Sequence, residues 1–411
     1  MRKIYTSIEL GSFSIKIVVC EIINNNPHVL ASSNTRCKGI RHGIIVDKEM
    51  VKDYLLTGIK EVEDRLGFKI NEAIIGIASK EKTFDVLTGK IKIENENRIV
   101  RKEEIEKTYQ DLVLGKVESG EELLSIMPIS FKVDDSELTK DPKGMVGDIL
   151  YLKAVIVRVP KENLKPYLDL FKECGIKVVD ITLSPIGDYY EVRNQEFDKD
   201  ISAIINIGYD KIDVSIYNKG ILIKYDYVPE GSKLIDKELA YLFNIKRGQA
   251  RNLKEKFAVA TKKYADINEV LELVNKDGQD ITVNQVEVSE VVENRLIYLF
   301  EVAKKEINLL TNREISNIII TGGISELAGF SGIVEDVFDA RTSIHDIREM
   351  GIRNNMYSTT LGLIKYFYEK LDFKGISYTM VKDDDLVKLN LVRNKNKDGI
   401  LNKVFGHFKD E

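Results

Sequence analysis

The sequence has few residues of the kinds that bind metals or form disulfides, and it has no long apolar run. Its three cysteines, Cys20, Cys37 and Cys174, are odd in number and lack metal-ligand spacing, which predicts reduced core thiols. The four histidines are dispersed, and no Ser/His/Asp or paired-carboxylate spacing predicts a catalytic centre. No run approaches the roughly 18 apolar residues of a membrane span, and no signal peptide precedes the first strand. These absences predict a cytoplasmic chain without disulfides or zinc.

The composition is that of a large globular protein with a small negative charge. The chain has 411 residues, of which 43% are hydrophobic and 31% charged. This length allows two or more domains with a large buried core. The net charge of −5 argues against nucleic acid as the main partner.

A glycine-centred turn occurs twice, 197 residues apart. Aligning Gly11 with Gly208 also pairs five apolar positions: Ile8 with Ile205, Leu10 with Ile207, Ile15 with Ile212, Ile17 with Val214 and Val19 with Ile216. Each copy alternates apolar and polar residues, which predicts two strands joined by a tight turn, with glycine supplying a positive φ. Backbone N–H groups beside the glycine are free to face an anion, so two opposed copies could hold the phosphates of one nucleotide. A plain β-hairpin is the alternative for either copy alone.

A third glycine motif follows an apolar strand near residue 320. Ile318–Ile320 lead to Thr321, Gly322 and Gly323, and residues 325–330 then enter a helix. Together the three motifs resemble the two phosphate loops and the adenosine loop of the actin, sugar kinase and Hsp70-chaperone superfamily. The resemblance implies an α/β fold of the actin-like kind, a duplicated ribonuclease H-like ATPase fold, with ATP bound between its halves.

An insertion at residues 83–160 separates the two halves. Its pattern predicts one helix, 101–114, followed by strands at 123–129, 131–133 and 150–159. A helix and a sheet of its own favour a small α+β subdomain over a loop.

Other helices are expected on both sides of the insertion. A helix that Asp47 caps should run through Leu66, and a second should cover residues 164–174. Ser232 should cap a long helical region that reaches about Lys263, with a short helix and a strand in 266–286. Further helices are predicted at 288–310 and 359–371.

Within this superfamily the chain is most similar to the bacterial cell-division family FtsA, over most of its length. The similarity lies in the first turn with its Ser-rich stretch and Lys16, and in four segments: 39–45, 127–134, 141–147 and 345–353. Actin, MreB and Hsp70-type proteins place their extra subdomain elsewhere, whereas FtsA has it at this position.

The resemblance implies a division into four subdomains, a linker and a terminal helix. These are subdomain 1A at 1–82 and 161–200, inserted subdomain 1C at 83–160, subdomain 2A at 201–225 and 303–358, subdomain 2B at 226–302, a closing helix at 359–372, a linker at 373–397 and an amphipathic helix at 398–411.

The resemblance also implies the residues that bind ATP and Mg²⁺. Those for the nucleotide are Gly11, Ser12, Phe13, Ser14, Lys16, Gly208, Tyr209, Asp210, Gly231, Ser232, Lys254, Gly322 and Gly323, and those for the metal are Glu9 and Asn206. The C-terminal tail of the tubulin-like protein FtsZ is expected on subdomain 2B, where Arg295 falls at a family contact position. A solvated helix arginine is the alternative for Arg295.

The sequence departs from the family at three places in this site. Glu9 and Asn206 stand where the family usually has aspartate, and Arg251 stands where a ribose-contacting glutamate is common. Mg²⁺ is commonly held through carboxylates and water, so a longer side chain and a neutral one should alter its hold. We therefore expect ATP to bind as a structural ligand that is hydrolysed very slowly or not at all.

The last residues, 398–411, have the pattern of an amphipathic helix. At 100° per residue its apolar side chains fall on one face, and these are Ile400, Leu401, Val404, Phe405 and Phe408. At about 1.5 Å per residue this helix is too short to cross a bilayer, but it suits the interface with an anionic membrane. A helix docked on the protein's own core is the alternative.

The sequence thus predicts an FtsA-like protein that binds ATP, polymerises and tethers FtsZ to the cytoplasmic membrane at the division septum. One alternative is an actin-fold adaptor of another envelope machine, of the PilM type. The other is a small-molecule kinase, although no aspartate is singled out as its base.

Overall fold

Two five-stranded sheets form the centre of the protein, for which a computed structural model describes residues 2–338, 341–382 and 384–386. In each sheet three antiparallel strands are followed by two parallel ones. The first has the order β10-β6-β1-β2-β3 and consists of β1 (Lys3–Leu10), β2 (Ser14–Ile23), β3 (Asn26–Arg36), β6 (Glu72–Ile77) and β10 (Lys177–Leu183). The second has the order β13-β12-β11-β16-β17 and consists of β11 (Ile201–Ile207), β12 (Ile212–Asn218), β13 (Ile221–Val228), β16 (Asn317–Thr321) and β17 (Thr342–Ile344).

The first hairpin has the same strand register in both sheets. Leu10 pairs with Ile15 across the first hairpin, and Ile207 pairs with Ile212 across the second. These pairs differ by the same 197 residues as the two glycine turns of the sequence. The predicted duplication, and with it the actin-like fold, is confirmed.

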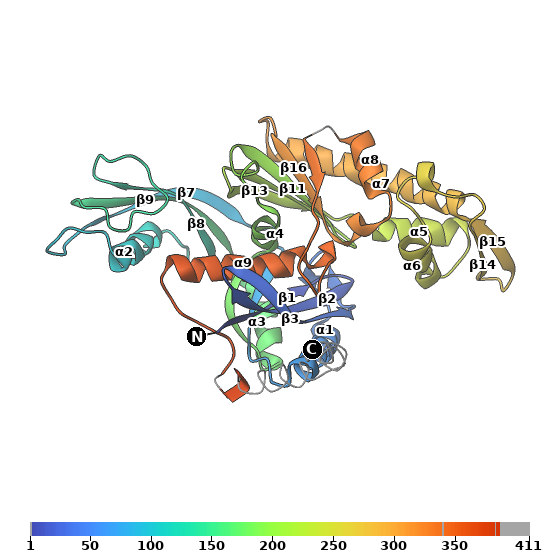
Figure 1. Ribbon diagram of the computed structural model, residues 1–411, viewed down its shortest axis with the longest axis horizontal. Helices are drawn as coiled ribbons and strands as arrows, with labels where there is room; N and C mark the ends of the chain where they lie inside the picture. The colour runs from blue at the N-terminus through green and yellow to red at the C-terminus, as the bar shows by residue number, and fades with distance from the viewer. Residues whose placement is uncertain (1, 339–340, 383, 387–411) are drawn as a thin grey trace, which may run out of the picture.

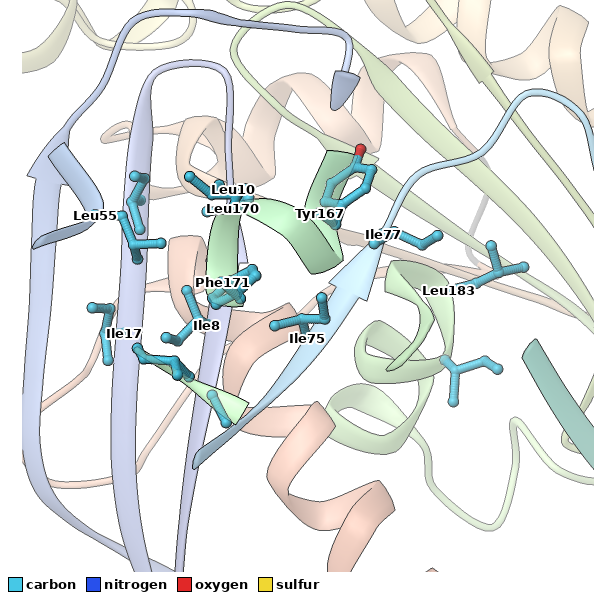
Figure 2. Packing of buried hydrophobic residues seen from close by; sticks show 14 of the residues in the cluster. Ile8, Leu10, Ile17, Leu55, Ile75, Ile77, Tyr167, Leu170, Phe171 and Leu183 are labelled. Carbon is cyan, nitrogen blue, oxygen red and sulfur yellow. The ribbon is translucent and has the colours of Figure 1, made fainter. Parts of the chain in front are cut away.

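Helices cover both faces of the first sheet and bury its side chains. Alternate residues of β2 point to opposite faces, so that Ile17 joins one apolar cluster and Val18 another. Figure 2 shows Ile8 of β1 among Leu55 of α1 and Phe171 of α3. The helices of the first half are α1 (Lys48–Leu66), α3 (Lys161–Glu173) and α4 (Ser184–Val192). Asp47 caps α1 as predicted, because its Oδ1 accepts a hydrogen bond from the Met50 N–H at 3.0 Å.

The insertion is a three-stranded sheet with one helix. It consists of β7 (Thr83–Lys92), α2 (Lys102–Val113), β8 (Glu121–Val133) and β9 (Ile149–Pro160), in the order β7-β9-β8. The prediction of a helix followed by strands is wrong at its start, since β7 comes first and is too exposed to show a clear apolar alternation. The two strands predicted at 123–129 and 131–133 are one strand, whose register shifts between Pro128 and Ser130.

The second half carries further helices, and the helix that follows them returns to the first sheet. Those of the second half are α5 (Lys233–Leu242), α6 (Arg247–Lys256), α7 (Gln285–Leu310) and α8 (Phe330–Val337), with short 3₁₀ helices η1 (Lys262–Tyr264), η2 (Gly323–Glu326) and η3 (Asn355–Tyr357). The returning helix, α9 (Ser358–Phe373), packs against the first sheet, where Phe367 shares an apolar cluster with Tyr5 and Val18. The helical region predicted from Ser232 to Lys263 breaks between α5 and α6, and the short helix predicted within 266–286 is wrong. That segment is a hairpin of β14 (Val270–Val274) and β15 (Asp280–Asn284), whose turn uses Gly278 at φ +81°.

The halves meet along the crossing of α4 and α9. Figure 1 shows these helices between the two sheets, with the insertion and the β14–β15 hairpin at opposite ends of the molecule. A short pair, β4 (Ile40–Arg41) and β5 (Ile44–Ile45), follows β3 at the edge of the cleft. This arrangement brings the turn after β1 and the turn after β11 to the same cleft.

Candidate functional site

A cavity of about 380 Å³ lies between the two halves. All but one of the residues predicted for nucleotide and metal line it. These are Glu9, Gly11, Ser12, Phe13, Ser14, Lys16, Asn206, Gly208, Tyr209, Asp210, Ser232, Lys254, Gly322 and Gly323. The exception, Gly231, packs against the backbone of the second turn. The topology therefore gathers three motifs around one space, although Gly11 and Gly322 are 311 residues apart in the sequence.

The glycines of the two turns are required for space and not for a left-handed backbone. Neither Gly11 nor Gly208 has a positive φ, so the predicted reason for glycine is wrong. A Cβ on Gly11 would lie 2.7 Å from the Ser14 carbonyl oxygen, and one on Gly208 would lie 3.0 Å from the Lys211 carbonyl oxygen. The first turn is therefore too tight for a side chain at its glycine, and the second leaves a side chain little room.

Two polar atoms of the first half are free at the cavity. Ser12 Oγ and Glu9 Oε2 are buried and have no hydrogen-bond partner within the described part of the chain. The Lys16 ammonium lies 3.3 Å from Glu9 Oε1, so one carboxylate oxygen is paired and the other is not. Such a hydroxyl and ammonium are groups that bind a phosphate.

Close backbone contacts hold the second turn in place. A Cβ on Gly231 would lie 2.7 Å from the Gly208 carbonyl oxygen, and one on Gly322, at φ +103°, would lie 2.5 Å from that of Ile207. The Ser232 N–H donates to the Gly208 carbonyl oxygen at 3.0 Å. Ser232 itself has right-handed helical φ and ψ, and its side chain makes no cap hydrogen bond, so the prediction that it caps α5 is wrong.

A buried carboxylate, Asp236, forms ion pairs with two buried cations of the second half. Lys254 donates to Asp236 Oδ1 at 2.6 Å, and the Arg251 Nε donates to Oδ2 at 3.1 Å. All three side chains are buried. Sequence reasoning identified Arg251 and Lys254 but missed Asp236, whose partners lie 15 and 18 residues along the chain.

Asp188 on α4 is a second carboxylate that sequence reasoning missed. Its two oxygens accept hydrogen bonds from Asn206 Nδ2 at 3.1 and 3.0 Å, and Oδ1 also accepts from Thr359 Oγ1 at 2.6 Å. These contacts join α4, β11 and α9 below the cavity. A signal was present, because Asp188 stands within Pro185–Tyr190, which is otherwise uncharged.

Asp188 should make stability depend on pH. Burial raises its pKa to about 7, against the opposing effect of the hydrogen bonds from Thr359 and Asn206. Between the unfolded pKa, about 3.9, and about 7 the folded protein keeps a proton that the unfolded chain loses. Stability should therefore fall with a slope of about 1.4 kcal/mol per unit from pH 5 to 7 and then level off.

Urea unfolding at a series of pH values measures this slope. Asp188→Asn should remove the slope of about 1.4 kcal/mol per pH unit that Asp188 contributes, because an amide does not titrate. The difference between the two proteins isolates Asp188 from other titrating groups. Parallel slopes for wild type and variant would contradict the assignment.

The residues fit a nucleotide better than a directly bound Mg²⁺. The tight turns, the free Ser12 hydroxyl and Lys16 fit phosphate oxygens. Asn206, however, donates its amide to Asp188, and one Glu9 oxygen is paired with Lys16. Among the described residues no group of three or more histidines, cysteines or acidic residues could hold a metal ion. The metal site at Glu9 and Asn206 remains a prediction that these contacts do not favour.

Two other predicted sites lie away from the cavity or beyond the described residues. Arg295 is on α7, with a side chain that is partly exposed and ion-paired with Glu238 of α5. The apolar face at 400–408 falls outside the described residues. Within the part of the chain that the structure covers, no helix has the length and apolar character to cross a membrane.

Solved structures that are similar in shape share this actin-like fold. PilM, in a PilM–PilN type IV pilus biogenesis complex, has a TM-score of 0.56 at 12% identity and covers 88% of this chain and 97% of its own. MreB5 of Spiroplasma citri bound to ADP has a TM-score of 0.55 at 13% identity and covers 91% and 98%. At these identities the likeness shows the fold alone.

Sequence comparisons identify the family. The family model "Cell division protein FtsA" matches residues 203–362, and "SHS2 domain inserted in FTSA" matches residues 83–158. FtsA of Bacillus subtilis is 22% identical over 377 residues, 91% of this chain and 86% of the relative. FtsA of Staphylococcus epidermidis ATCC 12228 is 25% identical over 396 residues, covering 91% and 82%. Both FtsA models match, one on the insertion and one on the second half, and the B. subtilis relative matches 91% of the chain. The chain therefore belongs to the FtsA family of cell-division proteins.

Proposed function

We propose that this protein binds ATP in its central cleft, assembles into actin-like filaments and tethers FtsZ to the cytoplasmic face of the membrane at the septum. The observation that carries the nucleotide part is the pair of matched turns that face one cavity, with Lys16 and the free Ser12 hydroxyl beside them. The division into subdomains 1A, 1C, 2A and 2B is part of the same proposal.

ATP would act here as a structural ligand. The backbone of both turns and Lys16 would hold its phosphates, and Gly322 and Gly323 would lie against the adenosine. When bound, ATP supplies negative charge that joins the two halves. Asn206 is a neutral amide turned toward Asp188, and one Glu9 oxygen is paired with Lys16, so these two positions supply one carboxylate where the family usually has two. This supports slow or absent hydrolysis.

The membrane part of the proposal depends on the sequence of residues 398–411. Five large apolar side chains on one face would bind a monomer weakly, and a filament would multiply them on one surface. Polymerisation and membrane attachment would thus strengthen each other. FtsZ would dock on the part of the molecule that carries Arg295.

Co-flotation with anionic liposomes tests the tether. We expect the whole chain to float and to carry FtsZ with it, and a chain that ends at Asn396 to stay in solution with its FtsZ. Arg295→Glu should lose FtsZ while keeping membrane binding, and Arg313→Glu, a charge reversal beyond the end of α7, is its matched control.

Three other outcomes would count against parts of the proposal. Flotation without FtsZ would favour an adaptor of another envelope machine, for which the likeness to PilM is the specific observation. Flotation of the truncated chain would place the membrane-binding surface elsewhere. Failure of both chains to float would contradict the tether.

A further inference from the structure

Side chains from both halves of the molecule meet across the nucleotide cavity. Phe13 belongs to the turn between β1 and β2, whereas Tyr209 follows β11 and Arg251 lies on α6. The Phe13 and Tyr209 ring centroids are 4.9 Å apart, with an interplanar angle of 41°. The Arg251 guanidinium carbon is 3.9 Å from the Phe13 centroid and 4.7 Å from the Tyr209 centroid. We call these three residues the clasp.

Arg251 is held by two groups of its own half. Its guanidinium pairs with Asp236 Oδ2 at 3.0 Å and also donates to the Tyr209 hydroxyl. Asp236 is 1% exposed and also pairs with Lys254, so Arg251 has its counterion within the second half. The planar guanidinium can therefore present its face to an aromatic ring without losing its counterion.

The Phe13 ring also lies near a cation of its own half. The guanidinium carbon of Arg36, at the end of β3, lies 5.3 Å from the Phe13 centroid. The ring thus contacts one arginine of its own half and one of the opposite half. Of these two arginine contacts, the one with Arg251 crosses the cleft.

A second set of contacts holds the other side of the same turn. The His42 N–H donates to Asp210 Oδ2 at 3.2 Å, and His42 Nδ1 lies 2.8 Å from the Asp210 carbonyl oxygen. Asp210 is next to Tyr209 and is buried. Two residues of the first half, Phe13 and His42, therefore contact the second turn, one at Tyr209 and the other at Asp210.

We propose that the clasp gates nucleotide exchange. Phe13 and Tyr209 line the cavity and contact each other across it, so any separation of the halves that admits or releases a nucleotide breaks the clasp. Breaking it exposes two rings and a guanidinium face to water. The clasp should slow entry and release by a similar factor, and so set the lifetime of the complex more than its affinity. This inference rests on the proposed binding of ATP.

Stopped-flow binding of a fluorescent N-methylanthraniloyl ATP to the full chain tests the gate. Phe13→Ala should raise both the association and the dissociation rate constants by about tenfold, the effect expected from loss of one aromatic pair and one cation–π contact. The dissociation constant should change less than about threefold, since both rates move together. Arg36→Ala is the matched control, because it removes a cation from the same ring without touching the contacts across the cleft. Its rates should stay close to those of wild type.

Equal rates in wild type and Phe13→Ala would overturn the gate. If neither protein binds the nucleotide, the proposed ATP binding fails, and amide hydrogen exchange of the unliganded proteins then decides the clasp. Phe13→Ala should speed exchange at residues 207–211 by about tenfold if the clasp holds the second turn. Unchanged exchange there would overturn the clasp itself.

Discussion

Replacing Asp236 by asparagine is expected to lower the free energy of unfolding by about 3–5 kcal/mol, the usual cost of removing one partner from a buried ion pair. The carboxylate is 1% exposed and forms ion pairs with Lys254 at 2.6 Å and Arg251 at 3.0 Å. Asparagine keeps the shape but not the charge, so two buried cations lose their counterion. Urea unfolding monitored by circular dichroism gives the change.

Asp169→Asn is the matched control for this prediction. Asp169 pairs with Lys165 at 2.7 Å on the surface of α3, where water screens both charges. We expect its unfolding curve to coincide with that of wild type. Equal urea midpoints for Asp236→Asn and Asp169→Asn would show that the buried cluster is not held by charge. The loss of Asp236 should also loosen Arg251, and therefore the clasp that Arg251 makes with Phe13.

The features that sequence predicted well are those with a periodic or repeated signal. The two hairpins were found because Gly11 and Gly208 bring five apolar positions into register. Helix α1 was found because Asp47 precedes a regular apolar face. Strand β7 and the β14–β15 hairpin were missed because few of their side chains are buried, and a strand without a buried face has little apolar alternation to detect.

The site was only partly predictable for a different reason. The residues at the two turns were named from their motifs, and the structure gathers them around one cavity. Asp188, Asp236 and the contact of Phe13 with Arg251 depend on which elements the fold brings together. Phe13 and Arg251 are 238 residues apart in the sequence. No local pattern specifies such a pair, because its geometry is set by the packing of the two halves.

The crossing of α4 and α9 provides the second large prediction, for Gly362→Ala. A Cβ on Gly362 would lie 1.8 Å from the Gly187 carbonyl oxygen and 2.9 Å from the Glu191 nitrogen. Both obstacles are backbone atoms and cannot rotate away, so the helices must separate. We expect a loss of about 3 kcal/mol or more, at the upper end of overpacking effects. Urea unfolding of wild type and variant gives the difference.

Gly248→Ala is the control, and the pH slope identifies the cause. The added Cβ, on α6, would meet nothing within 4 Å, so alanine should raise stability slightly, by up to about 1 kcal/mol.

Separation of α4 from α9 in Gly362→Ala should also admit water to Asp188, whose contact with Thr359 spans the same crossing. Hydration lowers the pKa of a buried carboxyl, so the fall in stability between pH 5 and 7 should shrink. A variant as stable as wild type, with an unchanged pH slope, would mean that the helices do not need this close approach.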